Sequence, residues 1–176
     1  MASGSDRPAA GPGPAAATDA AAAPDWPPWL VGAAAAVLIV DRLTKLLVVH
    51  DLPLGVAVWP GSPISLRRID NRGAAFGLLP EAQWLFVAVA LFVIVYIATH
   101  WRPLAGESAL LQAALGMLLG GAVANAFDRV VHGYVVDFVS VRDFATFNLA
   151  DSGITIGVVI VIARLVLGVG QGGPPR

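Results

Sequence analysis

Residues 109–127 read ALLQAALGMLLGGAVANAF, and this stretch decides the class of fold. It carries no charged side chain and has nearly the ~20 residues that a helix needs to cross ~30 Å of hydrocarbon. A second uncharged stretch, WLFVAVALFVIVYIAT, occupies residues 84–99. Because lipid offers the backbone no hydrogen-bond partner, such segments cross a membrane as helices. The two stretches therefore predict a membrane protein.

Two further apolar runs flank this pair. Residues 29–49 are interrupted by three charged side chains, and residues 150–169 carry two. Five prolines fall between the runs, where a missing N–H does no damage to a helix: Pro53, Pro60, Pro63, Pro80 and Pro103. We therefore predict an all-α membrane protein, a four-helix bundle with both termini on one side.

The composition of the chain excludes several classes of function. Of its 176 residues 57% are hydrophobic and only 13% are charged, whereas soluble domains carry roughly 25% charged residues. The net charge of −1 provides no basic surface for nucleic acid. The absence of cysteine excludes disulfides, thiolate metal sites and cysteine nucleophiles, and the three scattered histidines argue against a zinc enzyme. We expect no metal and no organic cofactor.

The connections between the runs differ from one another. Residues 56–59 and 64–69 are short, rich in β-branched side chains and roughly alternating, which indicates a small pair of strands on the membrane surface. Residues 100–108 are expected to form a short loop. Residues 128–149 are expected to form a longer, polar loop.

The strand pair can also be interpreted as a lid. Trp59 favours the headgroup region of a membrane, where its ring is buried and its N–H is wet. The segment that ends at Asn71 could close over a substrate, with Gly73 and Gly77 permitting the bend. A passive linker is the alternative.

The two ends of the chain are predicted to lie outside the folded domain. Residues 1–25 consist largely of alanine, proline and glycine, and cannot bury enough apolar surface to offset the entropy of ordering. Residues 170–176 have a similar composition. We therefore predict a disordered tail at 1–25, a membrane domain at 26–169 and a flexible tail at 170–176.

The polar residues gather on one side of this topology. Alternating helices bring five clusters to the same membrane face, and ionisable groups at membrane depth are costly and usually functional. The clusters are Asp41 with Lys45, Asn71 with Arg72, Asn125 with Asp128 and Arg129, Asp137, and Asn148 with Asp151.

Asp137 and Asp151 are the candidate catalytic pair. Both stand among apolar neighbours, where a carboxyl group has a raised pKa unless it is paired. Two such groups that meet share one proton, so that one is a general base for water and the other a general acid. The structural alternative makes Asp151 a favourable charge at a helix N-terminus and Asp137 a turn former.

The remaining polar residues have structural alternatives as well. Asp41 and Lys45 are four residues apart, share a helix face and can form an ion pair, or Lys45 can extend to the interface. Asp128 is interpreted as a charge that caps the end of its helix. Asn125 follows a run of small residues that lets another backbone approach closely.

Five blocks of the sequence together resemble the signature blocks of lipoprotein signal peptidase, also called signal peptidase II. They occur in the order of that family, and the resemblance extends over about residues 41–157. The blocks are DRLTK (41–45), NRGAAFG (71–77), GGAVANAFDR (120–129), VVDF (135–138) and FNLADSGI (147–154).

The resemblance implies an aspartic endopeptidase of the bacterial cytoplasmic membrane that needs no cofactor and is inhibited by globomycin. Its substrates are prolipoproteins, cut just before a diacylglyceryl-modified cysteine. The implied arrangement has cytoplasmic termini, an active site at the outer leaflet and an extracytoplasmic β element, in a monomer surrounded by membrane lipids. The implied catalytic residues are Asp137 and Asp151, the substrate-binding residues are Asn71, Asn125, Arg129 and Asn148, and the supporting residues are Asp41, Lys45 and Asp128.

The sequence departs from the family pattern at two positions. Ala124 stands where glycine is expected, and Arg42 stands where a neutral glutamine is common. Two other functions are alternatives. A small proton-coupled transporter or channel subunit would use the aspartates as a relay, but a relay needs polar groups along the depth of the membrane. A purely structural assembly protein would leave the aspartates replaceable.

Overall fold

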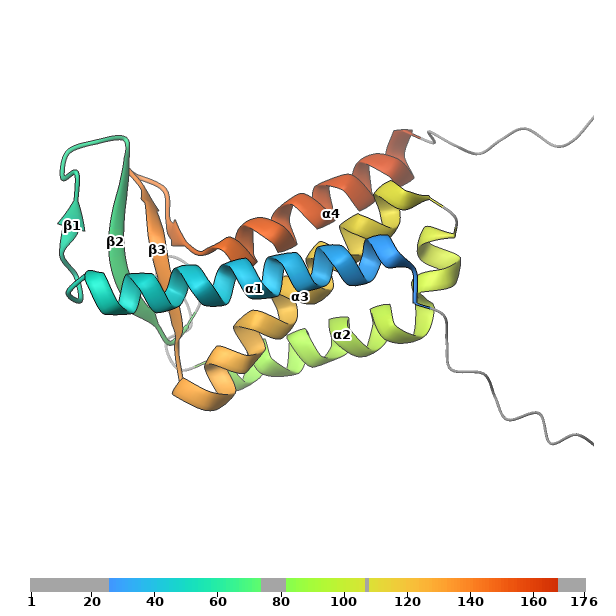
Figure 1. Ribbon diagram of the computed structural model, residues 1–176, viewed down its shortest axis with the longest axis horizontal. Helices are drawn as coiled ribbons and strands as arrows, with labels where there is room; N and C mark the ends of the chain where they lie inside the picture. The colour runs from blue at the N-terminus through green and yellow to red at the C-terminus, as the bar shows by residue number, and fades with distance from the viewer. Residues whose placement is uncertain (1–25, 74–81, 107, 168–176) are drawn as a thin grey trace, which may run out of the picture.

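The computed structural model describes residues 26–73, 82–106 and 108–167. In this part of the chain, elongated helices lie against one another and a small sheet sits at one end of them (Figure 1). The predictions for residues 1–25, 170–176 and Gly77 lie outside the described residues. The helices are α1 (Pro28–Asp51), α2 (Gln83–Ala105), α3 (Ala109–His132) and α4 (Leu149–Leu167), and the strands are β1 (Ala57–Val58), β2 (Ile64–Asn71), β3 (Val135–Val141) and β4 (Thr146–Phe147).

Helix α3 is the central element and packs against each of the other three helices (Figure 1). The small residues of the uncharged stretch 109–127 explain this position. A Cβ on Gly120 would lie 2.4 Å from the carbonyl oxygen of Ala34 in α1, and a Cβ on Gly121 would lie 2.5 Å from that of Ala150 in α4. The two helices thus approach α3 at backbone distance, as small residues permit in membranes.

Three helices of the described chain, α2, α3 and α4, are long and apolar enough to cross a membrane. Their outward side chains suit lipid, since Phe92 of α2 and Leu165 of α4 are 69% and 77% exposed. Helix α1 is also long, but it carries Asp41, Arg42 and Lys45 and is not among the three. The structure therefore agrees with a mostly helical membrane protein.

The sheet is larger than the sequence predicted. The expected strand pair is present as β1 and β2, but the order β1-β2-β3-β4 is completed by two strands from residues 128–149. The prediction of a polar loop there was wrong. Val136 and Phe138 of β3 are buried against Val48 of α1, so an apolar run too short for a helix is stabilised as a strand.

Two helices also extend further than predicted. Helix α3 continues to His132, where Gly133 ends it in the left-handed conformation with φ 78°. Helix α2 continues through Pro103 to Ala105, so the predicted loop over 100–108 is wrong in part. Trp101 and Ala105 are buried in a cluster with Leu30 and Leu115, and this packing outweighs the hydrogen bond that Pro103 cannot donate.

Candidate active site

The N-terminus of α4 is closed by a reciprocal pair of hydrogen bonds. The side-chain oxygen of Asn148 accepts from the backbone N–H of Asp151 at 2.9 Å, and Oδ2 of Asp151 accepts from the backbone N–H of Asn148 at 3.3 Å. This is the geometry of a capping box, in which the residue at the helix cap and the third helical residue satisfy each other's N–H groups. Asp151 therefore stands at a helix N-terminus, as its structural alternative predicted. Its second oxygen, Oδ1, faces the side chains of the rest of the site.

Asp137 lies on β3 between two amide donors. Asn148 Nδ2 donates to Oδ1 of Asp137 at 2.7 Å, and Asn71 Nδ2 donates to Oδ2 at 2.8 Å. The amide of Asn71 is held in this orientation because its own oxygen accepts from the backbone N–H of Gly73 at 2.9 Å. Antiparallel pairing of β2 with β3 brings the end of β2 beside this carboxyl group.

The surroundings of Asp137 favour its protonated form. Its side chain is only 3% exposed. Burial, and secondarily the charge of Asp151, raise the pKa of Asp137 to about 6, while the amides of Asn71 and Asn148 and the charge of Lys45 oppose the shift. A carboxyl group of this kind can hold a proton at a pH where an exposed aspartate is fully ionised.

Asn125 of α3 connects Asp151 to a buried cation. Its Nδ2 donates to Oδ1 of Asp151 at 2.7 Å. Its Oδ1 accepts from Lys45 Nζ at 3.0 Å and from Asn148 Nδ2 at 3.2 Å. Asn125 and Asn148 are 5% and 0% exposed, so this network is almost closed to solvent.

A cluster of buried charged side chains lies next to the amide of Asn125 and joins α1, α3 and α4. Lys45 Nζ lies 2.7 Å from Oδ2 of Asp41 and 2.7 Å from Oδ2 of Asp128. Oδ1 of Asp41 accepts from the backbone N–H of Ala150 at 2.9 Å and so satisfies a second free N–H at the start of α4. The predicted ion pair of Asp41 with Lys45 is thus present.

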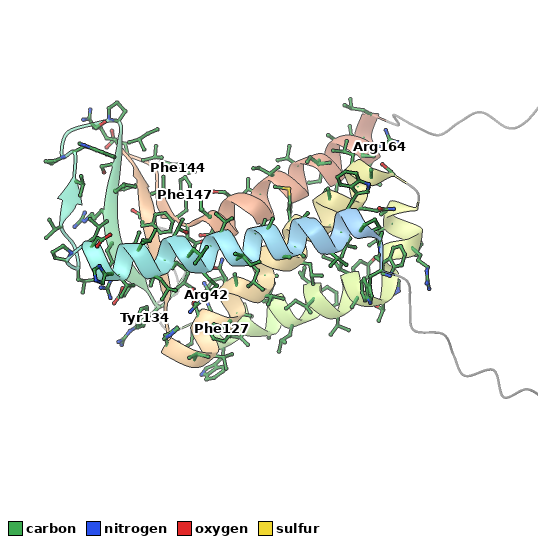
Figure 2. The ribbon with its side chains drawn as sticks, in the orientation of Figure 1. Arg42, Phe127, Tyr134, Phe144, Phe147 and Arg164 are labelled. Atoms are coloured by element: carbon green, nitrogen blue, oxygen red, sulfur yellow. The ribbon has the colours of Figure 1, made fainter. Side chains whose placement is uncertain are left out.

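Asp128 does not cap its helix, and that prediction was wrong. Its side chain is 2% exposed and faces α1, because α3 continues beyond it. Besides Lys45, it forms an ion pair with Arg42, whose guanidinium also lies 4.7 Å from the ring centre of Phe127 (Figure 2). Arg42, a departure from the family pattern, is therefore a partly exposed member of this charged cluster.

Arg129 lies at the edge of the network. Its guanidinium is 5.0 Å from the ring centre of Phe86, and Nη1 donates to the backbone oxygen of Asn125 at 3.4 Å. Its buried Nε has no hydrogen-bond partner among the described residues. Phe86 was missed from the sequence, where nothing distinguishes it from the other apolar residues of its helix.

The network forms one wall of a cavity of about 830 Å³. Both candidate catalytic aspartates line it, with apolar side chains of α2, α3 and α4 extending along the remainder. Figure 2 shows Phe144 and Phe147 in the segment between β3 and the start of α4, and both line the cavity. The predicted site residues on its wall are Asn71, Gly73, Asn125, Arg129, Asp137 and Asp151.

Asn148, Asp41, Lys45 and Asp128 lie behind this wall and reach the cavity only through their partners. The structure thus brings all ten predicted residues into one connected region, in two layers. Ser152, which also lines the cavity, was not predicted. The capping pattern of Asn148 and Asp151 was readable from the sequence as a cap followed three residues later by an acid.

Comparison with known proteins identifies the family. The sequence profile described as signal peptidase (SPase) II matches residues 33–167. The chain belongs to the signal peptidase II family. A lipoprotein signal peptidase of Symbiobacterium thermophilum is 41% identical over 136 residues, which cover 74% of this chain and 89% of that protein. A lipoprotein signal peptidase of Rhodococcus jostii is 39% identical over 142 residues, covering 77% and 71%.

A solved structure supports the same conclusion. It is described as a bacterial membrane enzyme, superposes with a TM-score of 0.75 at 28% identity, and covers 84% of this chain and 93% of that one. Membership of the signal peptidase II family and the apolar helices make this chain a multi-pass membrane protein and an aspartic peptidase. The transporter alternative finds no support.

Proposed function

We propose that this chain removes the signal peptide from diacylglyceryl-modified prolipoproteins by cutting on the N-terminal side of the lipidated cysteine, with Asp137 and Asp151 as its catalytic pair. The names of its relatives support the lipoprotein substrate. The observation that carries the proposal is the shared wall of the cavity. Two carboxyl groups there are each held by two hydrogen-bond donors, and apolar helices continue the space beside them.

The proposed reaction uses one proton shared between the two aspartates. The ionised carboxylate takes a proton from a water molecule, and the water oxygen forms a bond to the scissile carbonyl carbon. The protonated carboxyl group gives its proton to the carbonyl oxygen. When the tetrahedral intermediate collapses, the C–N bond breaks and the aspartate that took a proton from water gives it to the amine of the lipidated cysteine. The other aspartate, now ionised, takes a proton from a hydroxyl group of the intermediate, so that the pair again shares one proton. The raised pKa of Asp137, about 6, suits it to hold the shared proton before the reaction.

The amide network limits which side chains can bind substrate. An asparagine amide has two N–H donors, and both donors of Asn148 are engaged by Asn125 and Asp137. Asn71 and Asn125 each use one donor on a carboxyl group and keep one for an extended substrate backbone. Arg129, with its buried Nε free of partners in the described chain, can donate to a substrate carbonyl.

The proposed arrangement in the membrane has four spans, both termini in the cytoplasm and the active site near the outer leaflet. Helix α1 can serve as the fourth span because Asp41 and Lys45 form an ion pair inside the bundle rather than facing lipid. The sheet would then rest on the outer surface. Trp59, which is 63% exposed, would reach the headgroups there. The enzyme acts as a monomer, with its grooves open sideways to lipid.

The decisive experiment incubates the purified full-length protein in detergent with two forms of one prolipoprotein. The lipidated form should be cleaved before its cysteine. The unmodified form should be a poor substrate, since it has no acyl chains to occupy the lipid side of the cavity. Equal cleavage of both forms would instead indicate a general intramembrane peptidase. No cleavage of either form would contradict the proposal.

A further inference from the structure

The contacts of Lys45 suggest a role beyond the stability of the bundle. Its side chain is 3% exposed and does not line the cavity, so it cannot touch substrate. One of its contacts nevertheless leads towards the catalytic pair, because Nζ donates to Oδ1 of Asn125 and Nδ2 of Asn125 donates to Oδ1 of Asp151. The chain of contacts from Lys45 to Asp137 is longer, because it passes through both Asn125 and Asn148, and the amide of Asn148 does not itself accept from the ammonium group.

An ammonium group can only donate hydrogen bonds. Lys45 therefore requires the oxygen of Asn125 to face it, and this turns the amide nitrogen of Asn125 towards Asp151. Asn148 adds to the constraint, since its amide also donates to the oxygen of Asn125 while its own oxygen accepts from the backbone of Asp151. Rotating the Asn125 amide by half a turn would lose all three hydrogen bonds of that side chain.

The two aspartates are consequently not equivalent. Both oxygens of Asp151 accept hydrogen bonds, one of them from an amide polarised by a buried cation, and the residue stands in the first turn of α4. Asp137 accepts from two amides, and neither of them accepts in turn from a charged group. The negative charge of a pair that shares one proton is better placed on Asp151.

On the basis of the proposed function, we infer that Lys45 is a positioning residue of this peptidase. Acting through Asn125, it makes Asp151 the member of the pair that carries the negative charge and takes the proton from water, and it leaves Asp137 to carry the shared proton.

The surrounding charges determine how this inference must be tested. Asp41 and Asp128 flank Lys45, Arg42 and the more distant His132 face Asp128, and Arg129 and Asp137 lie on the side of Asp151. Removing Lys45 alone would leave buried carboxylates without compensation and would destabilise the fold for an unrelated reason. The test therefore removes a cation and an anion together.

The test variant is Asp41→Asn combined with Lys45→Met, in the full-length protein. An asparagine at position 41 still offers an oxygen to the backbone N–H of Ala150, and the ion pair of Arg42 with Asp128 remains. The matched control is Arg42→Gln combined with Asp128→Asn. It removes the other ion pair of the same cluster and leaves the contact between Lys45 and Asn125 in place.

The readout is the pH dependence of kcat/KM for cleavage of a lipidated prolipoprotein, whose acid limb reports ionisation of the general base. The test variant should move this limb to higher pH by about one unit, which is about tenfold slower cleavage on the acid side, with KM nearly unchanged. The control should leave the limb in place. Asn125→Ala breaks the same chain of contacts without removing any charge and should move the limb in the same direction.

Three outcomes would overturn the inference. In the first, the acid limb does not move in the folded test variant; in the second, it moves equally in the control; in the third, it does not move in Asn125→Ala. If the test variant does not fold, the result for Asn125→Ala decides alone. The proposed function fails separately. If Asp137→Asn or Asp151→Asn still cleaves, the catalytic assignment is wrong. If both variants lose cleavage but the acid limb of the Lys45 test variant does not move, only the role of Lys45 is rejected.

Discussion

Nδ2 of Asn148 donates a hydrogen bond of 2.7 Å to Oδ1 of Asp137, although Asn148 caps α4 and Asp137 lies in the sheet. The same asparagine exchanges two hydrogen bonds with Asp151. One buried side chain therefore sets the position of the sheet relative to the helix that carries the second aspartate. The geometry of the catalytic pair depends on where α4 begins.

Replacing either aspartate should abolish cleavage without unfolding the protein. We expect Asp137→Asn and Asp151→Asn each to lower kcat by about 10³-fold or more, because the two groups act as a unit. Asparagine has the same shape and keeps an oxygen for the neighbouring amides. A cleavage assay with lipidated prolipoprotein, together with thermal unfolding in detergent, measures both effects. Turnover near the wild-type level in either folded variant would contradict the assignment.

The stability of the protein should fall as the pH rises through the range in which Asp137 ionises. Because burial and Asp151 raise the pKa of Asp137 from 3.8 to about 6, the folded state binds this proton more tightly than the unfolded state. The contribution of this group is fully present below pH 3.8 and is lost as the pH rises to about 6, by up to about 3 kcal/mol. A plot of the free energy of unfolding against pH should therefore be less steep between pH 4 and 7 in Asp137→Asn than in the wild type. Parallel plots for the two proteins would argue against the raised pKa of Asp137.

Asn148 allows its structural and catalytic roles to be separated. Asn148→Ser keeps a side-chain oxygen that can cap α4 but has no amide to donate to Asp137, so the cap should be retained while cleavage falls sharply. Asn148→Ala loses the same amide and the cap as well, and should therefore be less stable than the serine variant by about 1 kcal/mol. Thermal unfolding and kcat of the two variants give the comparison. Equal activity of the serine variant and the wild type would show that the bond to Asp137 is dispensable.

The lid interpretation of the β1–β2 segment remains a prediction. Trp59 is 63% exposed, so Trp59→Ala should alter folding little but should raise KM for the lipidated substrate several-fold. Gly73→Val should impair both folding and cleavage, because a β-branched side chain restricts the backbone at this position, whose N–H holds the amide of Asn71 that faces Asp137. Spin labels at positions 59 and 66 should lose mobility when a tight-binding inhibitor is added. Unchanged mobility, together with unaltered kinetics of Trp59→Ala, would leave only a passive linker.

The close contact of α1 with α3 can be tested with two glycines that stand in helices. Gly120→Ala should destabilise the bundle, since its Cβ would meet the Ala34 carbonyl oxygen at 2.4 Å. Gly32→Ala is the matched control, because nothing lies within 4 Å of its added Cβ. It should be neutral or stabilising by up to about 1 kcal/mol. Unfolding midpoints in detergent that change equally in both variants would contradict the packing argument.

The sequence by itself determined the helical framework of this protein. Long apolar runs such as 109–127 must become helices wherever lipid replaces water, because every backbone group has to be satisfied within the segment. Local patterns also indicated the pairing of Asp41 with Lys45 and the strands around Trp59. The prediction missed β3, although its valines favour a strand, and burial of its apolar residues against α1 stabilises it there.

Only the tertiary structure decided how the site is connected. Lys45 and Asn125 are 80 residues apart in the chain, Arg42 and Asp128 are 86 apart, and Asn71 and Asp137 are 66 apart. Spacing along a helix or strand carries no information about such contacts. Each hydrogen bond also depends on which way an amide points, and buried partners from several elements set that direction together. The sequence therefore predicted which residues gather at the site, while the packing of α1, α3 and α4 with the sheet decided what each of them contacts.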